Sequence, residues 1–514
     1  MLPVLTPEEA AAWDHRATEL GVPLATLMES AGRAVLAVIA GRYPETLRAG
    51  VLVAAGTGHN GGDGWVLARA LQRAGVPVWV AAVAGDRAAL TAHMAALARG
   101  DGVREVAADG PWPNVGLLVD ALLGGGARGA PRAPVQALVD RLHDLALPIV
   151  AIDGPTGLDL QSGVVHGAAR ADVTVTFAGV RRGHLLARDE TGDLVVVDVG
   201  HPGSADRCPL LVDDAAASEW LPPLPAATHK AERGRVVIVG GAAGMSGAIR
   251  MAGRAAFGAG AGLVHAVAPE STVADLVLAE PDLQTAVQDL DADPAPELLE
   301  LVRRGVLVIG PGLGRSSARR ALVLALVAEA RAAVLDADAL TLLADGAAAI
   351  RTLAGSRALV LTPHRGEFRT VFPALSAGSE VDPWRAAEAA AAESGATVLL
   401  KGVPTVVART GRRLLTVAAG NPGLATGGSG DILAGLVGAF LAGGLEPDTA
   451  AALGAQTLGR AADLAARRTT ARGLRPMDVV AALPDLWREW RTHRLARPAP
   501  RPPVLLELSR PRST

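Results

Sequence analysis

Apolar residues along the chain fall into short runs that alternate with longer amphipathic segments. Four runs in the first half predict strands, because each is short, rich in β-branched residues or leucine, and stops at glycine or proline. They are VLVAAG (51–56), VPVWVAAVAG (76–85), GLLVDALLG (116–124) and LPIVAIDGP (147–155). Helices are predicted at roughly 7–20, 24–40 and 64–75. This alternation predicts a parallel sheet with helices on both faces.

The second half starts the same alternation again. Its predicted strands are GRVVIVGG (234–241), LVHAVAP (263–269), GVLVIGPG (305–312), RAAVLDADAL (331–340), ALVLTPHRGE (358–367) and ATVLLKG (396–402). A helical region from Asp431 to about Arg468 closes it. Prolines 222, 223 and 225 mark a connector, so we expect two α/β domains, residues 1–212 and 213–487. The remainder, 488–514, is rich in Arg and Pro and is expected to be poorly ordered, with a partner-binding arm as the lesser alternative.

Composition narrows the class of protein. The chain has 514 residues, half of them apolar and only 3% aromatic, which suits helices packed on parallel sheets. A formal net charge of -3 gives no overall signal for nucleic acid. The single cysteine, Cys208, excludes an internal disulfide and fits a reducing compartment. We see neither a signal peptide nor an uninterrupted membrane-spanning stretch, so we expect a cytoplasmic protein that binds neither membranes nor nucleic acid.

A glycine loop, GTGHNGGDG (56–64), joins the first predicted strand of this series to a helix. Glycines there let backbone N–H groups approach a phosphate, although the spacing matches neither the dinucleotide fingerprint nor a Walker loop. A tight turn without ligand is the alternative. Asp120 and Asp153 end two later strands, and their oxygens suit a hard cation, although each could instead cap the next turn.

The second half contains GGSGD (427–431) at the start of an apolar helix. Amide groups there can stabilise a transferring phosphoryl group, and Asp431 is placed to accept a proton from an attacking hydroxyl. A simple helix cap is the alternative. GPGLG (310–314), TPHRGE (362–367) and KGVPTVV (401–407) also lie at predicted strand ends. Taken alone, His364 is a structural histidine and Lys401 a surface lysine.

Four motifs in order, LMESAG (27–32), the glycine loop, VDALLGGGARG (119–129) and AIDGPTGLD (151–159), resemble the epimerase domain of the NAD(P)H-hydrate repair enzymes. The resemblance covers about residues 1–210 and implies a Rossmann-like, three-layer αβα fold. It implies K⁺ binding by Asn60, Asp120 and Thr156, and an acid/base role at the damaged nicotinamide for Asp153. The further substrate-binding residues it implies are His59, Asn60, Gly61, Gly62, Asp63, Gly124, Gly125, Gly126, Ala127, Arg128, Gly129 and Ala130. The family usually has Asn at the position of His59, which could add a pH dependence.

GGAAGMSGA (240–248), GPGLG, TPHRGE, KGVPT and GGSGD together resemble the dehydratase domain of the same enzymes, a ribokinase-like α/β domain, over about residues 213–485. This resemblance implies that four residues contact the hydrated cofactor: Ala248, Gly312, His364 and Asp431. It implies that the nucleotide contacts Lys401, Gly402, Val403, Pro404, Thr405 and Gly430. The fusion in this order implies ADP as the phosphoryl donor, and phosphoryl transfer implies Mg²⁺.

The expected activity is therefore repair of hydrated NADH and NADPH, by epimerisation of the R and S hydrates and ADP-dependent dehydration of the S hydrate, with AMP and phosphate as products. The expected partners are these small molecules and a second copy of the chain in a homo-oligomer. A ribokinase-like sugar or vitamin kinase is the alternative, but it leaves the first half unexplained. A non-catalytic nucleotide-binding protein is disfavoured by the intact Asp120, Asp153 and Asp431.

Overall fold

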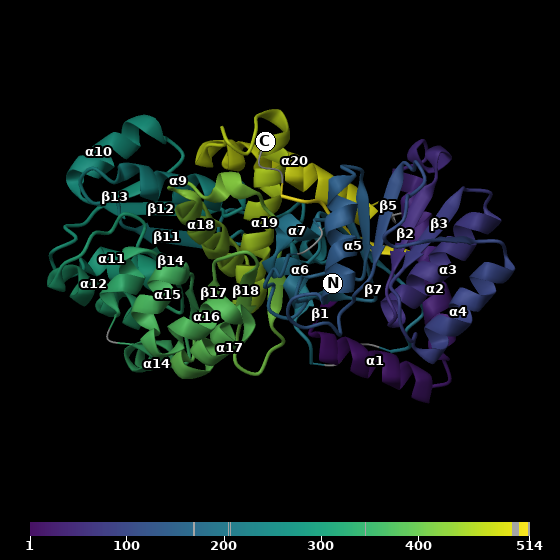
Figure 1. Ribbon diagram of the computed structural model, residues 1–514. Helices are drawn as coiled ribbons and strands as arrows, with labels where there is room; N and C mark the ends of the chain where they lie inside the picture. Colours follow the sequence, from purple (N-terminus) through teal and green to yellow (C-terminus); the bar gives the residue numbers. More distant parts are fainter. Residues whose placement is uncertain (168–169, 204, 206, 345, 496–502, 512–514) are drawn as a thin grey trace. The chain divides into compact units, whose positions relative to one another are not determined.

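The structure is a computed structural model that describes residues 1–514 except 168–169, 204, 206, 345, 496–502 and 512–514 (Figure 1). The chain forms two compact units. The first contains Leu2–Cys208 and a C-terminal segment that ends at Pro511, and the second contains Pro209–Pro498. The division falls slightly before the predicted end of the first domain at residue 212.

The first unit is built on one sheet with the strand order β20-β9-β7-β6-β5-β2-β3-β4. Its strands are β2 (Val51–Ala55), β3 (Val78–Ala82), β4 (Arg104–Val106), β5 (Leu117–Ala121), β6 (Ile149–Ile152), β7 (Val173–Phe177), β9 (Asp193–Val197) and β20 (Val504–Leu508). All neighbours pair parallel except β20 with β9. A separate parallel pair is formed by β1 (Leu2–Leu5) and β8 (Val180–Arg181). The predicted parallel sheet is confirmed.

Helices cover both faces of this sheet. They are α1 (Pro7–Glu19), α2 (Leu24–Arg42), α3 (His59–Arg73), α4 (Ala89–Gly100), α5 (Ala133–Asp144), α6 (Arg182–Leu186) and α7 (Arg188–Thr191), with a 3₁₀ turn at Thr46–Ala49. Val51 and Val53 pack with α2, α3 and α4. The alternate residues Leu52 and Ala54 pack with α5 on the other face. Because successive side chains of a strand point to opposite faces, continuous apolar runs are required where both faces are buried.

One described helix, α2, is long and apolar enough to cross a membrane by length and composition alone. It is nevertheless a core helix, since Leu27, Ala31, Val35 and Ile39 are buried in the cluster that also holds α3. These residues recur every four positions and so form one apolar stripe along the helix.

The second unit has a sheet with the order β13-β12-β11-β14-β15-β16-β17-β18-β19-β10. Its strands are β10 (Leu210–Leu211), β11 (Arg235–Val239), β12 (Leu263–Ala268), β13 (Gln284–Val287), β14 (Val306–Ile309), β15 (Ala332–Leu335), β16 (Ala358–Leu361), β17 (Thr397–Leu400), β18 (Thr405–Ala408) and β19 (Leu415–Val417). The strands from β13 to β17 pair parallel, and β17, β18 and β19 continue as an antiparallel meander.

The helices of this unit lie between and after its strands. They are α8 (Asp214–Trp220), α9 (Ser246–Gly258), α10 (Glu270–Ala279), α11 (Pro296–Arg303), α12 (Ser317–Glu329), α13 (Asp338–Leu342), α14 (Ala347–Ala354), α15 (Arg365–Val371), α16 (Ser376–Val381), α17 (Pro383–Ser394), α18 (Ser429–Ala442), α19 (Pro447–Arg468) and α20 (Pro476–Leu495), with 3₁₀ turns at Pro373–Leu375 and Pro422–Leu424. The helical region predicted from Asp431 is therefore two helices.

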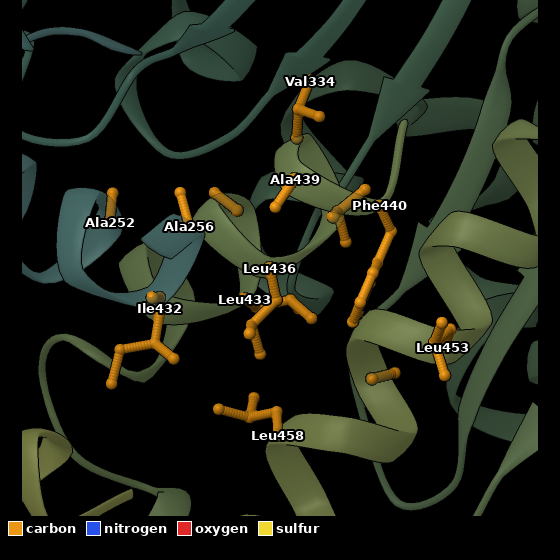
Figure 2. Packing of buried hydrophobic residues seen from close by; sticks show 14 of the residues in the cluster. Ala252, Ala256, Val334, Ile432, Leu433, Leu436, Ala439, Phe440, Leu453 and Leu458 are labelled. Atoms are coloured by element: carbon orange, nitrogen blue, oxygen red, sulfur yellow. The ribbon is translucent and has the colours of Figure 1, made fainter. Parts of the chain in front are cut away.

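Helix α18 is the centre of the second core (Figure 2). Every residue from Ile432 to Leu441 is buried, so this helix is apolar on all sides. Figure 2 shows Leu436 and Phe440 among side chains from α9, α19 and β15. A Cβ at Gly435 would lie 2.1 Å from the carbonyl oxygen of Ala252, so glycine permits the close crossing of α18 and α9.

The expectation of a poorly ordered tail from residue 488 is wrong for the described residues. Helix α20 continues to Leu495, because the fully buried Trp490 anchors its last turns in the core. Strand β20 then pairs antiparallel with the edge of β9, on the sheet of the first unit. Side-chain contacts with two arginines also hold the register of β20. Arg42 bridges Asp193 and Glu507, and buried Arg188 donates to the carbonyl oxygens of residues 508 and 509.

Ending the chain at residue 502 removes β20, and we expect it to lower the free energy of unfolding of the first unit by about 2 kcal/mol, since several edge hydrogen bonds are lost. Hydrogen exchange of the β9 amides measures this directly, and the amides of β14 in the second unit serve as the internal reference. A chain that ends at Pro511 is the matched control. Unchanged exchange in β9 after removal of β20 would contradict the prediction.

Candidate active sites

A cavity of about 520 Å³ lies in the first unit at the carboxyl ends of its parallel strands. Its chemistry-bearing lining residues are Asp14, His59, Asn60, Asp63, Asp153, Arg181 and His201. Apolar side chains from α1 and α2 complete the wall. A cavity at the carboxyl edge of a parallel sheet is where such folds bind ligands.

The glycine loop forms the floor of this cavity. A Cβ at Gly61 would lie 2.0 Å from the carbonyl oxygen of Gly56, so no side chain fits there. Helix α3 begins at His59, and its N-cap residue Gly58 provides no side-chain cap. No side chain of the N-cap residue therefore caps the first N–H groups of α3, and uncapped N–H groups at the start of a helix are suited to phosphate.

Asp120 and Thr156 form a buried oxygen cluster beside this loop. The Thr156 hydroxyl and backbone N–H each donate to Asp120 at 2.7 Å, and the N–H of Leu122 donates at 3.1 Å. Burial raises the pKa of Asp120, and the three donors oppose that shift. Asn60 is 8% exposed, and neither its amide oxygen nor its amide nitrogen has a partner among the described residues.

These residues fit a monovalent cation. An orphaned buried amide oxygen, a buried carboxylate and a hydroxyl are oxygen donors of the kind hard cations prefer, and a cation would favour the charged form of Asp120. Within the described part of the chain no group of three or more His, Cys, Asp or Glu side chains could hold a metal ion. The set of possible ligands therefore consists of one carboxylate and neutral oxygens.

Each oxygen atom of Asp153, in the carboxylate and in the backbone carbonyl, accepts a hydrogen bond. The N–H of Gly125 donates to Oδ2 at 2.8 Å, and the Thr176 hydroxyl donates to Oδ1 at 3.2 Å. The Arg181 guanidinium lies 3.3 Å from Oδ1. The backbone of Asp153 has φ +63°, a left-handed conformation that is costly for a residue with a side chain.

His184 anchors that backbone. Its Nδ1 accepts from the N–H of Arg181 at 3.1 Å, so the proton sits on Nε2, which donates to the Asp153 carbonyl at 2.7 Å. Burial, with Arg181 close by, lowers the pKa of His184 to about 3, so the ring is neutral. Burial opposes ionisation of Asp153 as well, but Arg181 and the hydrogen bonds outweigh it and hold the pKa of Asp153 below its usual value. Asp153 is thus an ionised carboxylate.

Some of the remaining residues predicted for this site line the cavity, and others do not. Gly124, Gly125, Gly126 and Ala127 line the cavity, whereas Arg128, Gly129 and Ala130 do not. Arg128 turns outward, because it donates to Glu8 at 2.6 Å and to two carbonyls of its own loop. His59 and Asp63 both line the cavity, and His59 is exposed there.

A second group of titratable side chains gathers at strand ends of the second unit. The Lys401 ammonium lies 2.8 Å from Asp336 and 3.6 Å from Glu367, and the Thr362 hydroxyl donates to Asp336 at 2.8 Å. A Cβ at Gly430 would lie 3.4 Å from Asp336 and 3.5 Å from Lys401. The GGSGD loop therefore sits directly on this ion pair. Burial opposes the charge of Lys401, yet Asp336 and Glu367 raise its pKa.

Asp431 follows in the first turn of α18. Burial raises its pKa to about 7, and the nearby negative charges of Asp336 and Asp338 add to the shift, while Lys401 opposes it. Asp431 is not the N-cap of α18, which is Gly428. The alternative of a simple helix cap is therefore wrong, and a carboxyl group with a pKa near neutrality is suited to general base catalysis.

The other predicted residues of the second site meet in pairs. A Cβ at Gly312 would lie 3.2 Å from the Cβ of Ala248, so these two residues are in contact. Residues 364 and 401 form a parallel bridge, which places TPHRGE beside KGVPT. His364 caps α15, since its Nδ1 accepts from the N–H groups of Gly366 and Glu367, and the ring is otherwise exposed. In the loop 402–405, the Thr405 hydroxyl donates to Gly402 at 3.1 Å, and Val403 is exposed.

Five of the residues that build these sites were not predicted from sequence: Thr176, Arg181, His184, Asp336 and Glu367. Asp336 carried a usable signal, because it ends a predicted strand in the same way as Asp120 and Asp153. Arg181 and His184 carried none, since the pairing of β6 with β7 is what brings the segment after β7 against Asp153.

Comparison with known proteins supports the family resemblance of both halves of the chain. Residues 236–485 match the family described as NAD(P)H-hydrate dehydratase, and residues 24–183 match the YjeF-related protein N-terminus. The bifunctional NAD(P)H-hydrate repair enzyme Nnr of Escherichia coli K12 is 38% identical over 475 residues, which cover 90% of each chain. The enzyme of the same name from Moorella thermoacetica is 34% identical and covers 94% of this chain and 96% of its own.

A solved structure also matches the second unit. It is the ADP/ATP-dependent NAD(P)H-hydrate dehydratase from Bacillus subtilis, co-crystallised with ATP and Mg²⁺, with 25% identity and a TM-score of 0.49, covering 54% of this chain and 97% of that one.

Two α/β domains, each with acidic residues and glycine loops at its strand ends, define a two-site enzyme that acts on nucleotide-like substrates. The chain belongs to the family of bifunctional NAD(P)H-hydrate repair enzymes, with an N-terminal epimerase domain and a C-terminal dehydratase domain. The resemblance stated from the motifs is confirmed.

The raised pKa of Asp431 predicts a pH dependence of dehydration if this carboxyl group is the base. A base must be ionised, so we expect kcat/KM for dehydration to rise with pH through about 7 and then level off. Asp336→Asn removes a neighbouring negative charge and is expected to move the midpoint to lower pH. Steady-state rates between about pH 6 and pH 8 measure this. A flat profile for the wild-type chain over that range would contradict it.

Proposed function

We propose that the C-terminal domain dehydrates the S hydrate of NADH or NADPH in an ADP-dependent reaction, and that the N-terminal domain interconverts the R and S hydrates. The observation that carries this proposal is that each domain has one buried acid beside a glycine loop, and that the pKa values of the two acids differ. The pKa of Asp431 is near neutrality, whereas Asp153 is held as a carboxylate. AMP and phosphate are the expected by-products.

The hydrate carries a hydroxyl at C6, next to the ring nitrogen. Hydroxide is a poor leaving group, whereas phosphate leaves readily as the nitrogen lone pair forms an iminium. Asp431 takes the hydroxyl proton as the phosphoryl group is transferred, and the amides of the GGSGD loop stabilise the transferring group. Loss of phosphate and of a C5 proton restores the dihydronicotinamide. A bound Mg²⁺ supplies charge neutralisation on the phosphates.

The roles proposed for the remaining second-site residues come from the family resemblance. Ala248 and Gly312, which touch each other, and His364 contact the hydrated cofactor. Residues 401–405 and Gly430 contact the nucleotide. The Lys401 ammonium is already paired with Asp336, so it acts on the phosphates as one member of a charged pair rather than as a free cation.

In the first domain, His59 to Asp63 and Gly124 to Ala130 hold the substrate, and Asp153 acts on C6. Asn60, Asp120 and Thr156 hold K⁺, which would complete the coordination of the orphaned Asn60 amide oxygen and fix the loop. Arg128 follows the part of this loop that lines the cavity, and it contributes to binding only through its backbone, since its side chain is tied to Glu8. A homo-oligomer and a cytoplasmic location stay predictions.

An absorbance assay tests the proposal. Purified protein is incubated with mixed epimers of NADH hydrate, Mg²⁺ and K⁺ with either ADP or ATP, and recovery of the dihydronicotinamide band is followed. Complete recovery with ADP is expected, because one epimer must be converted before it is dehydrated. Recovery that stops when one epimer is consumed would refute the epimerase. No recovery with either nucleotide would favour a small-alcohol kinase or a binding protein.

Two substitutions separate the sites. Asp431→Ala is expected to reduce ADP-dependent dehydration by about 100-fold or more and leave epimer exchange intact, since only the second site loses its base. Asp153→Ala is expected to do the reverse. Persistence of dehydration in Asp431→Ala would refute the assignment of the base. Loss of both activities in either variant, together with a lower melting temperature, would indicate a folding defect.

A further inference from the structure

Exchange of the C6 hydroxyl between two faces of a ring requires a proton donor as well as a proton acceptor. Asp153 is suited only to accept, because Gly125, Thr176 and Arg181 all stabilise its carboxylate. The proposed epimerisation therefore lacks an acid.

Asp63 lines the same cavity as Asp153 but has a different environment. It lies one helical turn after Asn60 on α3, so the two side chains share a face. The Asn60 side chain and the Asp153 carboxylate both lie against Gly124, since a Cβ at Gly124 would be within 3.3 Å of each. Among the described residues, the Asp63 carboxyl accepts no hydrogen bond and forms no ion pair.

The charged and titratable groups around Asp63 favour its neutral form. Those that line the same cavity are Asp14 from α1, His59 from its own helix, and Asp153, Arg181 and His201. The guanidinium among them is engaged elsewhere, since Arg181 faces Asp153. His201 pairs with Asp14 at 2.6 Å. Burial, with Asp153 and Asp14 close by, raises the pKa of Asp63 well above its usual value.

We propose that Asp63 is a second catalytic residue of the epimerase, the acid that works against the base Asp153. This inference rests on the proposed function of the first domain and supplies its missing proton donor. A pair of carboxyl groups whose environments stabilise opposite protonation states is a known arrangement for acid/base catalysis.

The proton balance follows from the pair. The C6–O bond breaks with its electron pair on oxygen, which takes the Asp63 proton and leaves as water, while the N1 lone pair forms the C6=N1 iminium. Water adds to the opposite face of C6 and gives a proton to Asp153. The pair holds one proton at the start, on Asp63, none while the iminium exists, and one at the end, on Asp153; the reverse reaction or exchange with solvent returns it to Asp63.

The test compares full-length wild type, Asp63→Asn, Asp63→Glu and a matched control, Asp109→Asn, which makes the same change at an exposed acid. Interconversion of separated epimers is measured without nucleotide, so the second domain does not contribute. Asp63→Asn is expected to lower kcat by about 100-fold or more with little change in KM, and Asp63→Glu to recover part of the rate. Asp109→Asn is expected to match the wild type.

A pH profile separates a catalytic role from a structural one. The wild-type rate is expected to fall as pH rises and Asp63 ionises, and the residual rate of Asp63→Asn to lack that fall. Hydrogen exchange of the β9 amides, which belong to the same unit as Asp63, shows whether the variant is folded. Exchange by Asp63→Asn within about threefold of wild type, or a loss confined to KM, would overturn the inference and leave the proposed function standing. A wild-type chain that exchanges no epimers would overturn both.

Discussion

Both parallel sheets are buried on both faces, and this constraint decides where chemistry is possible. Successive side chains of each strand point toward opposite helical layers. A polar side chain in the middle of a strand is therefore shielded from water and from ligands. Only the carboxyl ends of the strands are open. Asp120, Asp153 and Asp336 all stand at or just after such ends, and each is the centre of a hydrogen-bonded cluster.

The same residue type is tuned in different ways at these ends. Asp153 is surrounded by donors and a guanidinium, so burial does not neutralise it. Asp431 has like charges beside it and one lysine that is already shared, so its pKa rises to about 7. The difference is electrostatic, since both carboxyl groups are largely removed from water. It suits the two carboxyl groups to the different acid/base roles that we propose for the two sites.

Close approach of backbone is the second requirement of both sites. Gly61 lets the start of α3 lie against Gly56, and Gly435 lets α18 cross α9. The first contact holds the start of α3 at the cavity, and the second fixes the position of α18, whose first turn lies beside the ion pair. Replacing either glycine by a residue with a Cβ forces backbone apart, so the loops depend on packing as much as on their own flexibility.

The sequence by itself determined the two α/β domains, the loop at 56–64, the GGSGD helix and the acids at the strand ends. Short apolar runs, glycine loops and strand-end polar residues are local signals, and the order of the motifs pointed to the family. Tertiary structure alone decided which groups meet: His184 with the Asp153 carbonyl, Lys401 with Asp336, and Arg128 turned away to Glu8. It also decided the fate of the C-terminal segment, since Arg- and Pro-rich composition predicts no pairing, and β20 is ordered by the exposed edge of β9 and by Arg42 and Arg188. Contacts between residues far apart in sequence have no periodicity to reveal them, and only the packed chain brings them together.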